Sequence, residues 1–298
     1  IVNSIGNTIY NLKNNSSLTG TGATANTVGI LHLRTAAGQT IAQNTIYDIV
    51  NTHPTAVVSV TGIHATFPTS GANLVSRNNI HSLNINSSNN TSNMIGINAF
   101  AGIATYHNNM IRLGIDASGS AITTGYNIIG IQQSSATANN FFYFNSIYIG
   151  GTGVSGNNNT YAYQRIAGTA ATNLRNNILF NERAHSAGTA FNYAVGLTAS
   201  TAVTSNYNIY KSDGSNGRVG LINTTTYAAL TDWQNVFSND INSIYGPVSF
   251  YNVTGNAAAV NLHIDPLVPS QNESAGVYIA NYGDIDGDIR FGEPAYLG

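Results

Sequence analysis

Short apolar segments alternate with polar stretches along the whole chain, and one kind of segment recurs behind an asparagine. Its seven copies are NTIYNL, NTIYDI, NNIHSL, NNMIRL, NSIYIG, NNILFN and NYNIYK, which begin at Asn7, Asn44, Asn78, Asn108, Asn145, Asn176 and Asn206. The apolar residues that anchor these copies are Ile9, Ile46, Ile80, Met110, Ile147, Ile178 and Ile209, in steps of 30 to 37 residues. This spacing predicts a repeat of about 33 residues that contributes a strand at each copy.

A second segment, a Gly followed by an aliphatic residue, interleaves with the first. Its copies are Gly29-Ile30, Gly62-Ile63, Gly96-Ile97, Gly130-Ile131, Gly196-Leu197 and Gly220-Leu221, with a degenerate copy at Ala162-Tyr163. Two strands per repeat joined by Asn, Gly, Ser and Thr predict a parallel β-solenoid, because the polar stretches leave no room for the helices of a helical repeat. We expect Ile30, Ile63, Ile97 and Ile131 to stack inward in consecutive coils.

The spacing inside the first segment predicts a corner. Ile9 and Leu12 are three residues apart, as are Ile46 and Ile49, and a straight strand would point such pairs to opposite faces. A residue in the left-handed region at or near Asn11, Asp48 and Ser82 would turn both aliphatic side chains inward. Met110 and Leu113 show the same spacing, but Arg112 suits such a corner poorly. Stacked Asn side chains at a corner can form an amide ladder along the axis.

The polar residues of this chain are rarely charged. Only 7% of the 298 residues are charged, whereas 43 are Asn and 30 are Gly, and the formal net charge is −2. We therefore predict neither a nucleic-acid partner nor insertion into a membrane. The absence of Cys excludes disulfides and thiolate chemistry. A surface with so little charge favours an extracellular or cell-surface location.

The repeat pattern resembles the right-handed parallel β-helix proteins of the pectate-lyase-like superfamily, and in particular long secreted surface proteins of Bacteroidota. The most specific segments are YAALTDWQNVFSNDINSIYGPVSF from Tyr227, NLHIDPLVPS from Asn261 and GDIDGDIR from Gly283. The resemblance implies a right-handed coil and a chain that is part of a longer polypeptide exported by type IX secretion. We predict an all-β fold: a single right-handed parallel β-helix of about seven coils over residues 1–220, and a last coil with an irregular C-terminal cap over residues 221–298 in the same domain.

The densest group of carboxylates is Asp284, Asp286 and Asp288. Oxygen ligands at alternate positions suit Ca²⁺, although Gly287 and Ala295 do not match the Gly and Glu positions of an EF-hand loop. A Ca²⁺ site is one hypothesis, and the alternative is a surface turn in which Arg290 pairs with one of the carboxylates. No other cofactor is predicted.

Catalysis on a polysaccharide would need paired carboxylates on neighbouring coils, and none is evident. Asp48 and Asp116 lie two coils apart. His32 and His64 occupy nearly matching places, three and two residues after the Gly of the second segment, so their offset spoils a stack. The alternative for these two residues is an outward polar position on a strand. We expect the chain not to cleave uronic-acid polymers.

An aromatic stripe is the remaining candidate site. Tyr10, Tyr47, His81, Tyr148 and Tyr210 follow the inward aliphatic residues and are expected to point outward, with Ile111 and Leu179 in the gaps. Such a row could bind glycans, or its rings could stack on one another and protect the outer face. The single Trp, Trp233, is expected to pack under the last coil as part of the cap.

These patterns favour a structural or adhesive segment of a secreted or cell-surface protein, without catalytic activity of its own. The alternatives are a polysaccharide lyase or glycoside hydrolase built on a β-helix, and a carbohydrate-binding module. Expected partners are further copies of the chain, neighbouring domains of the same large protein, and surface glycans. Since solenoid ends expose strand edges, we expect the chain to work within an assembly.

Overall fold

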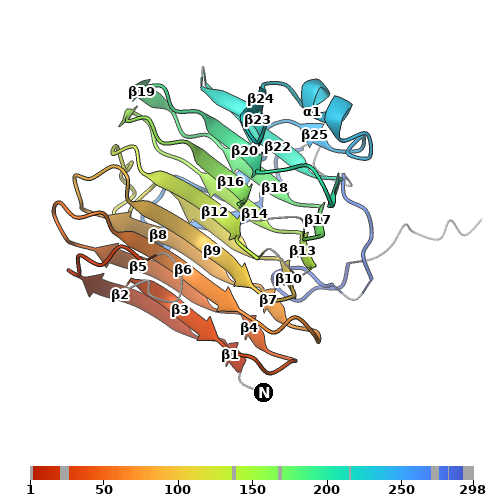
Figure 1. Ribbon diagram of the computed structural model, residues 1–298, viewed down its shortest axis with the longest axis horizontal. Coiled ribbons are helices and arrows are strands. Elements are labelled where there is room, and N and C mark those ends of the chain that lie inside the picture. The colour runs from red at the N-terminus through yellow and green to blue at the C-terminus, as the bar shows by residue number, and fades with distance from the viewer. Residues whose placement is uncertain are drawn as a thin grey trace, which may run out of the picture.

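The computed structural model describes residues 3–20, 27–135, 139–166, 170–214, 216–269, 275–280 and 282–290. They form an all-β, right-handed parallel solenoid of about seven coils, each contributing one strand to each of three stacked sheets (Figure 1). No helix among these residues is long and apolar enough to cross a membrane.

Each of the three sheets takes its parallel strands from successive coils. Sheet A contains β1 (Asn3–Ile5), β4 (Thr40–Ala42), β7 (Leu74–Ser76), β10 (Ala104–His107), β13 (Asn140–Tyr143), β17 (Thr172–Arg175) and β21 (Val203–Asn206). Sheet B contains β2 (Thr8–Asn14), β5 (Thr45–Asn51), β8 (Asn79–Ile85), β11 (Met110–Leu113), β14 (Ser146–Ile149), β18 (Ile178–Asn181), β22 (Ile209–Ser212) and β25 (Ile244–Tyr245). Sheet C contains β3 (Val28–Leu33), β6 (Ser59–Thr66), β9 (Asn93–Ala101), β12 (Asn127–Gln133), β16 (Thr160–Arg165), β20 (Asn192–Leu197), β23 (Gly217–Ile222) and the antiparallel β24 (Thr225–Tyr227).

The remaining elements lie outside the three sheets. Two short strands, β15 (Val154–Ser155) and β19 (His185–Ala187), pair in loops of neighbouring coils. The C-terminal part adds the helix α1 (Leu230–Val236), the 3₁₀ turn η1 (Ala257–Ala259) and an antiparallel pair, β26 (Phe250–Asn252) and β27 (Asn261–Ile264).

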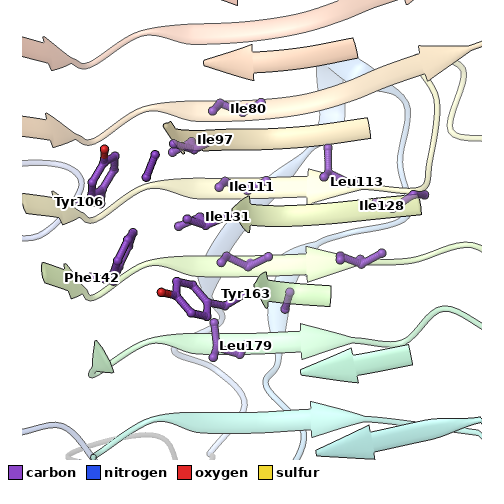
Figure 2. Packing of buried hydrophobic residues seen from close by; sticks show 14 of the residues in the cluster. Ile80, Ile97, Tyr106, Ile111, Leu113, Ile128, Ile131, Phe142, Tyr163 and Leu179 are labelled. Atoms are coloured by element: carbon purple, nitrogen blue, oxygen red, sulfur yellow. The ribbon is translucent and has the colours of Figure 1, made fainter. Parts of the chain in front are cut away.

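The predicted inward column is confirmed. Ile30, Ile63, Ile97 and Ile131 pair in register on β3, β6, β9 and β12, and all four are buried. Figure 2 shows Ile97 and Ile131 alternating with Ile80 and Ile111 of sheet B. The Gly before each Ile permits this approach, since a Cβ on Gly62 would lie 2.6 Å from both the Ile80 Cγ2 and the Gly96 carbonyl oxygen.

The register predicted from the sequence for the first segment is wrong in coils 4, 6 and 7. Ile80 pairs with Ile111 rather than Met110, and the column continues through Ile147 to Leu179 and Tyr210. The expected anchors Ile178 and Ile209 therefore belong to the neighbouring column of Met110. In the second segment, the degenerate copy at Ala162-Tyr163 is in register. Gly196 and Gly220 are not, because the next pairs in register are Ala194-Val195 and Val219-Gly220.

An asparagine ladder joins all seven coils at the corner between sheets A and B. In each coil the side-chain amide of one Asn donates to the Oδ1 of the next, at 2.8 to 3.0 Å. The members are Asn7, Asn44, Asn78, Asn109, Asn145, Asn177 and Asn208. The residue before each member has a positive φ of 53° to 70°, so the ladder sits at a left-handed turn that recurs in every coil.

The second left-handed corner, inside sheet B, is confirmed in three coils. Asn11, Asp48 and Ser82 have φ values of 55°, 52° and 56°. The spacing of Met110 and Leu113 has a different explanation, because the inward residue of that coil is Ile111, only two positions before Leu113. In coils 4 to 7 this strand is therefore uninterrupted, and Arg112 does not occupy a corner.

The C-terminal end of the solenoid is capped, as expected for Trp233. This fully buried ring lies against Gly220 of β23, where an added Cβ would come within 2.2 Å of it. Its indole nitrogen donates to the buried Asp240 carboxylate at 2.8 Å, which also accepts from the Tyr210 hydroxyl at 2.8 Å. Burial raises the pKa of Asp240, and hydrogen bonds from Ser243, Tyr210 and Trp233 oppose that shift.

The chain that follows the cap covers part of the outside of the solenoid. The strap, as we name residues 246–269, 275–280 and 282–290, returns along the outside of the solenoid from the capped end (Figure 1, blue). Val248 and Leu262 of the strap form a second apolar cluster with outward side chains of sheet B: Met110, Tyr148, Ile178, Phe180 and Ile209. Later strap residues reach coil 4, where Asn108 donates to the Gly283 carbonyl oxygen at 2.5 Å.

Candidate functional site

The outer row of sheet B contains most of the predicted aromatic stripe. Its members in register are Tyr10, Tyr47, His81, Arg112, Tyr148, Phe180 and Lys211. The prediction for Tyr210 is wrong: its side chain is fully buried in the main core, because the inward position of this coil lies one residue later than expected. Ile111 and Leu179 are core residues for the same reason, and Arg112 and Phe180 take their places in the row.

The first three rings of the row stack on one another. Tyr10 and Tyr47 have centroids 5.2 Å apart at an interplanar angle of 7°, and Tyr47 and His81 are 5.2 Å apart at 9°. Exposure falls along this stack from 58% at Tyr10 to 3% at His81. Burial, and secondarily the Arg112 charge, lower the pKa of His81 to about 4, so the ring is neutral at pH 7. Because both faces of Tyr47 are covered, this ring offers its edge and hydroxyl to the outside.

In coils 4 to 6 the strap covers the row. The Arg112 guanidinium is fully buried and donates to the carbonyl oxygens of Gly255 at 2.6 Å and Val253 at 3.2 Å. Tyr148 and Phe180 pack against the Phe250 ring, with centroids 6.3 Å and 6.1 Å from it. The strap therefore leaves the row open in coils 1 to 3 and covers it in coils 4 to 6, whereas Lys211 of coil 7 pairs with Asp213 at 2.6 Å.

A groove of about 620 Å³ lies on sheet B at the boundary between the open coils and the coils that the strap covers. One wall belongs to sheet B and consists of Thr45, Tyr47, Asp48, Asn79 and His81. The other wall combines the loop residues Ala117 and Ser118 with strap residues Asn256, Ala257, Ala258 and Val260. The two parts of the second wall are joined, since the Ala257 N–H donates to the Ala117 carbonyl oxygen at 3.0 Å. The groove thus brings together residues more than 200 positions apart.

The sequence pattern pointed to Tyr47 and His81 but not to the strap wall of this groove. The signal for the strap lies in the residue after each ladder Asn. This residue is Thr8, Thr45 and Asn79 in the uncovered coils, and Met110, Ser146, Ile178 and Ile209 in the covered coils. An outward position that changes from polar to apolar in three of four coils indicates a covering segment.

The acidic residues 284–288 form a turn. One Asp284 oxygen accepts from the N–H groups of Gly287 and Asp288, each at 2.8 Å, and Asp286 lies 3.0 Å from His263. Arg290 donates to Asn108 at 2.8 Å, and its guanidinium lies over the Phe144 ring. Within the described residues no three acidic or histidine side chains gather as a metal site, and a Ca²⁺ site at Asp284, Asp286 and Asp288 stays a prediction.

The two sheet C histidines do not form a pair. Leu31 is opposite His64, and His32 is opposite Ala65, which confirms the offset. Both side chains are buried: His32 packs against the Phe67 ring at 5.0 Å and His64 against the Phe100 ring at 4.8 Å. Burial lowers the pKa of His64 to about 4.

The fold and this site define a right-handed parallel β-solenoid with a Trp cap, a C-terminal strap and a groove beside a stacked aromatic row. Comparison with protein-family models, curated proteins and solved structures found no match for this chain.

Proposed function

We propose that this chain is a structural and adhesive segment of a secreted or cell-surface protein, without catalytic activity of its own. The observation that carries the proposal is the unbroken asparagine ladder from Asn7 to Asn208. It ends by connecting to the cap, since the Asn208 N–H donates to the Ser243 hydroxyl at 2.8 Å. A continuous chain of buried hydrogen bonds strengthens each member and opposes the opening of single coils.

The ladder also fixes the outer surface. Each interior member donates a second bond to a carbonyl oxygen of the preceding coil, as Asn109 does to Val75 at 3.0 Å and Asn145 to Tyr106 at 2.9 Å. Outer side chains are thereby held at the strand spacing of about 4.8 Å. A rigid surface with a regular repeat suits the presentation of contacts to another molecule.

Buried arginines support the same interpretation. Arg183 donates to the Gly150, Ile122 and Thr124 carbonyl oxygens at 2.7 to 3.1 Å, and Arg112 does the same for the strap. Burial lowers the pKa of Arg183 to about 10, so it stays charged at pH 7. These cations hold loops against the solenoid, a structural task.

We also propose that the chain belongs to the pectate-lyase-like superfamily and is exported by type IX secretion. The tail segments that resemble surface proteins of Bacteroidota support membership of the pectate-lyase-like superfamily and export by type IX secretion. Low charge and exposed apolar side chains such as Leu31, Leu33 and Phe100 support contacts with further copies or with neighbouring domains of a longer protein. The groove beside His81 favours a second candidate function, that of a carbohydrate-binding module.

The test measures adhesion to cells and turnover of polysaccharides with residues 1–298. We expect the protein to bind bacterial or host cell surfaces in a pull-down, and to release no unsaturated uronate or reducing sugar from pectin or alginate. Light scattering over a concentration series should show self-association. Sustained turnover that disappears in His81→Ala or Asp48→Asn would replace this proposal by that of a polysaccharide-acting enzyme.

A further inference from the structure

We propose that the groove between sheet B and the strap binds a short neutral oligosaccharide, an inference that rests on the adhesive function proposed above and names its ligand class. The groove is open to solvent and large enough for several sugar units at about 620 Å³. It lies on the outside of coils 2 and 3, where β5 and β8 form the sheet wall.

The two walls differ in chemistry in a way that suits a sugar. The sheet wall offers the Tyr47 hydroxyl, the Asp48 carboxylate and the Asn79 amide, which can exchange hydrogen bonds with hydroxyl groups. The strap wall offers the small apolar side chains of Ala257 and Ala258. A pyranose has a hydroxyl-rich edge and an apolar C–H face, so it can satisfy both walls at once.

The charge of the lining selects against acidic sugars. Asp48 supplies a carboxylate, and none of the lining residues is Lys or Arg. The nearby Arg112 is fully buried and its Nη1 and Nη2 groups donate to strap carbonyl oxygens and to Ser82, so it forms no direct ion pair with a ligand. His81 is neutral at pH 7, because burial lowers its pKa to about 4. A uronic-acid polymer would meet repulsion here, whereas a neutral sugar would not.

The backbone of the sheet wall cannot pair with an extended peptide. β5 is paired with β2 on one side and β8 on the other, and β8 is paired in turn with β11. Their main-chain groups are engaged in the sheet, so a peptide could not add itself as a further strand. The wall of side-chain hydroxyl, amide and carboxylate groups remains available, and it recognises hydroxyl groups.

The test uses the complete chain and isothermal titration calorimetry. The probes are cellohexaose, xylohexaose and mannohexaose as neutral oligosaccharides, and hexagalacturonate as the charged one. We expect at least one neutral probe to bind, and hexagalacturonate to bind at least about tenfold more weakly, a difference of about 1.4 kcal/mol.

Two substitutions test whether the neutral probe binds in the groove. Ala258→Trp fills the groove from the strap and Ser118→Trp fills it from the loop, and both positions are exposed, so the fold should persist. Each should weaken the neutral probe at least about tenfold. The matched control is Ala259→Trp, which adjoins Ala258 but does not line the groove and should leave binding unchanged. Melting curves on all three confirm folding.

The proposal is overturned if no neutral probe binds, if hexagalacturonate binds as tightly, or if the two groove variants bind like the control. Binding of an unstructured peptide in the groove with no response to sugars would also overturn it. Retained adhesion to cells in any of these cases would leave the structural function in place. Turnover of a probe would instead contradict the proposed function itself.

Discussion

Coils 1 to 3 and coils 4 to 7 share one interior but present two different outer faces on sheet B. In the first part Tyr10, Tyr47 and His81 stack outside a strand that contains a left-handed residue. In the second part the strand is uninterrupted, and Tyr148 and Phe180 lie under the strap. The interior column and the asparagine ladder run through both parts without a break. The core therefore determines the solenoid, and the outer positions determine what covers it.

The largest effect is expected in the shared core. Ile97 is fully buried and pairs with Ile63 and Ile131, so Ile97→Asp would place an unpaired charge in an apolar interior. We expect the free energy of unfolding to fall by more than about 4 kcal/mol, as measured by urea denaturation. The control Ile97→Val should cost only about 1 kcal/mol. An unchanged midpoint for the Asp variant would show that the column is not a continuous core.

The ladder should matter more inside the solenoid than at its first coil. The Asn109 side chain donates to Val75 and Asn145 and accepts from Asn78, all within the buried corner. Asn109→Ala removes these hydrogen bonds from the buried corner and should cost about 3 kcal/mol. The control is the exposed Asn7, where the same substitution should cost less than about 1 kcal/mol. Equal losses in thermal denaturation at both positions would contradict a larger contribution of the ladder inside the solenoid.

Much of the shared interior could be predicted from the sequence, because a repeat places the same residue type at the same point of every coil. The column of Ile30 and the corners at Asn11 and Asp48 follow from spacing alone. The strap could not be predicted in this way, because it is not repeated and some of its partners lie 175 residues away. Its apolar partners also produced the register error: Met110 resembles an inward anchor, yet it is apolar because the strap covers it.

Three buried histidines should make the stability of both parts depend on pH. Burial lowers the pKa values of His64, His81 and His107 to about 4, with Arg112 adding to the effect at His81, and Arg77 and Arg290 at His107. The unfolded chain binds these protons near pH 6.5. Stability is therefore full above that pH and falls as the pH drops toward 4, by up to about 2 kcal/mol for each histidine at pH 5.

Urea midpoints at pH 7.5 and pH 5 measure this loss while most exposed carboxylates remain ionised. The variant His107→Phe keeps a ring against Tyr282, which lies 4.6 Å from the His107 ring, and should reduce the loss of stability at pH 5 by up to about 2 kcal/mol. Identical midpoints at the two pH values would contradict the assignment of neutral, buried histidines.

The smallest change in stability is expected when single residues are exchanged between the open and the covered outer face of sheet B. Thr45 and Ile178 occupy equivalent positions after a ladder Asn, but Thr45 lines the open groove and Ile178 lies buried under the strap. Ile178→Thr should cost about 1.5 kcal/mol, because it removes apolar contact with the strap and buries a hydroxyl. It should also speed hydrogen exchange in residues 246–264. The reciprocal Thr45→Ile changes an incompletely buried position that no strap residue has to accommodate, and its effect should stay within about 0.5 kcal/mol. If the two substitutions instead cost the same, the strap would add nothing to the stability of the covered coils, and the change from polar to apolar residues after the ladder would need another cause.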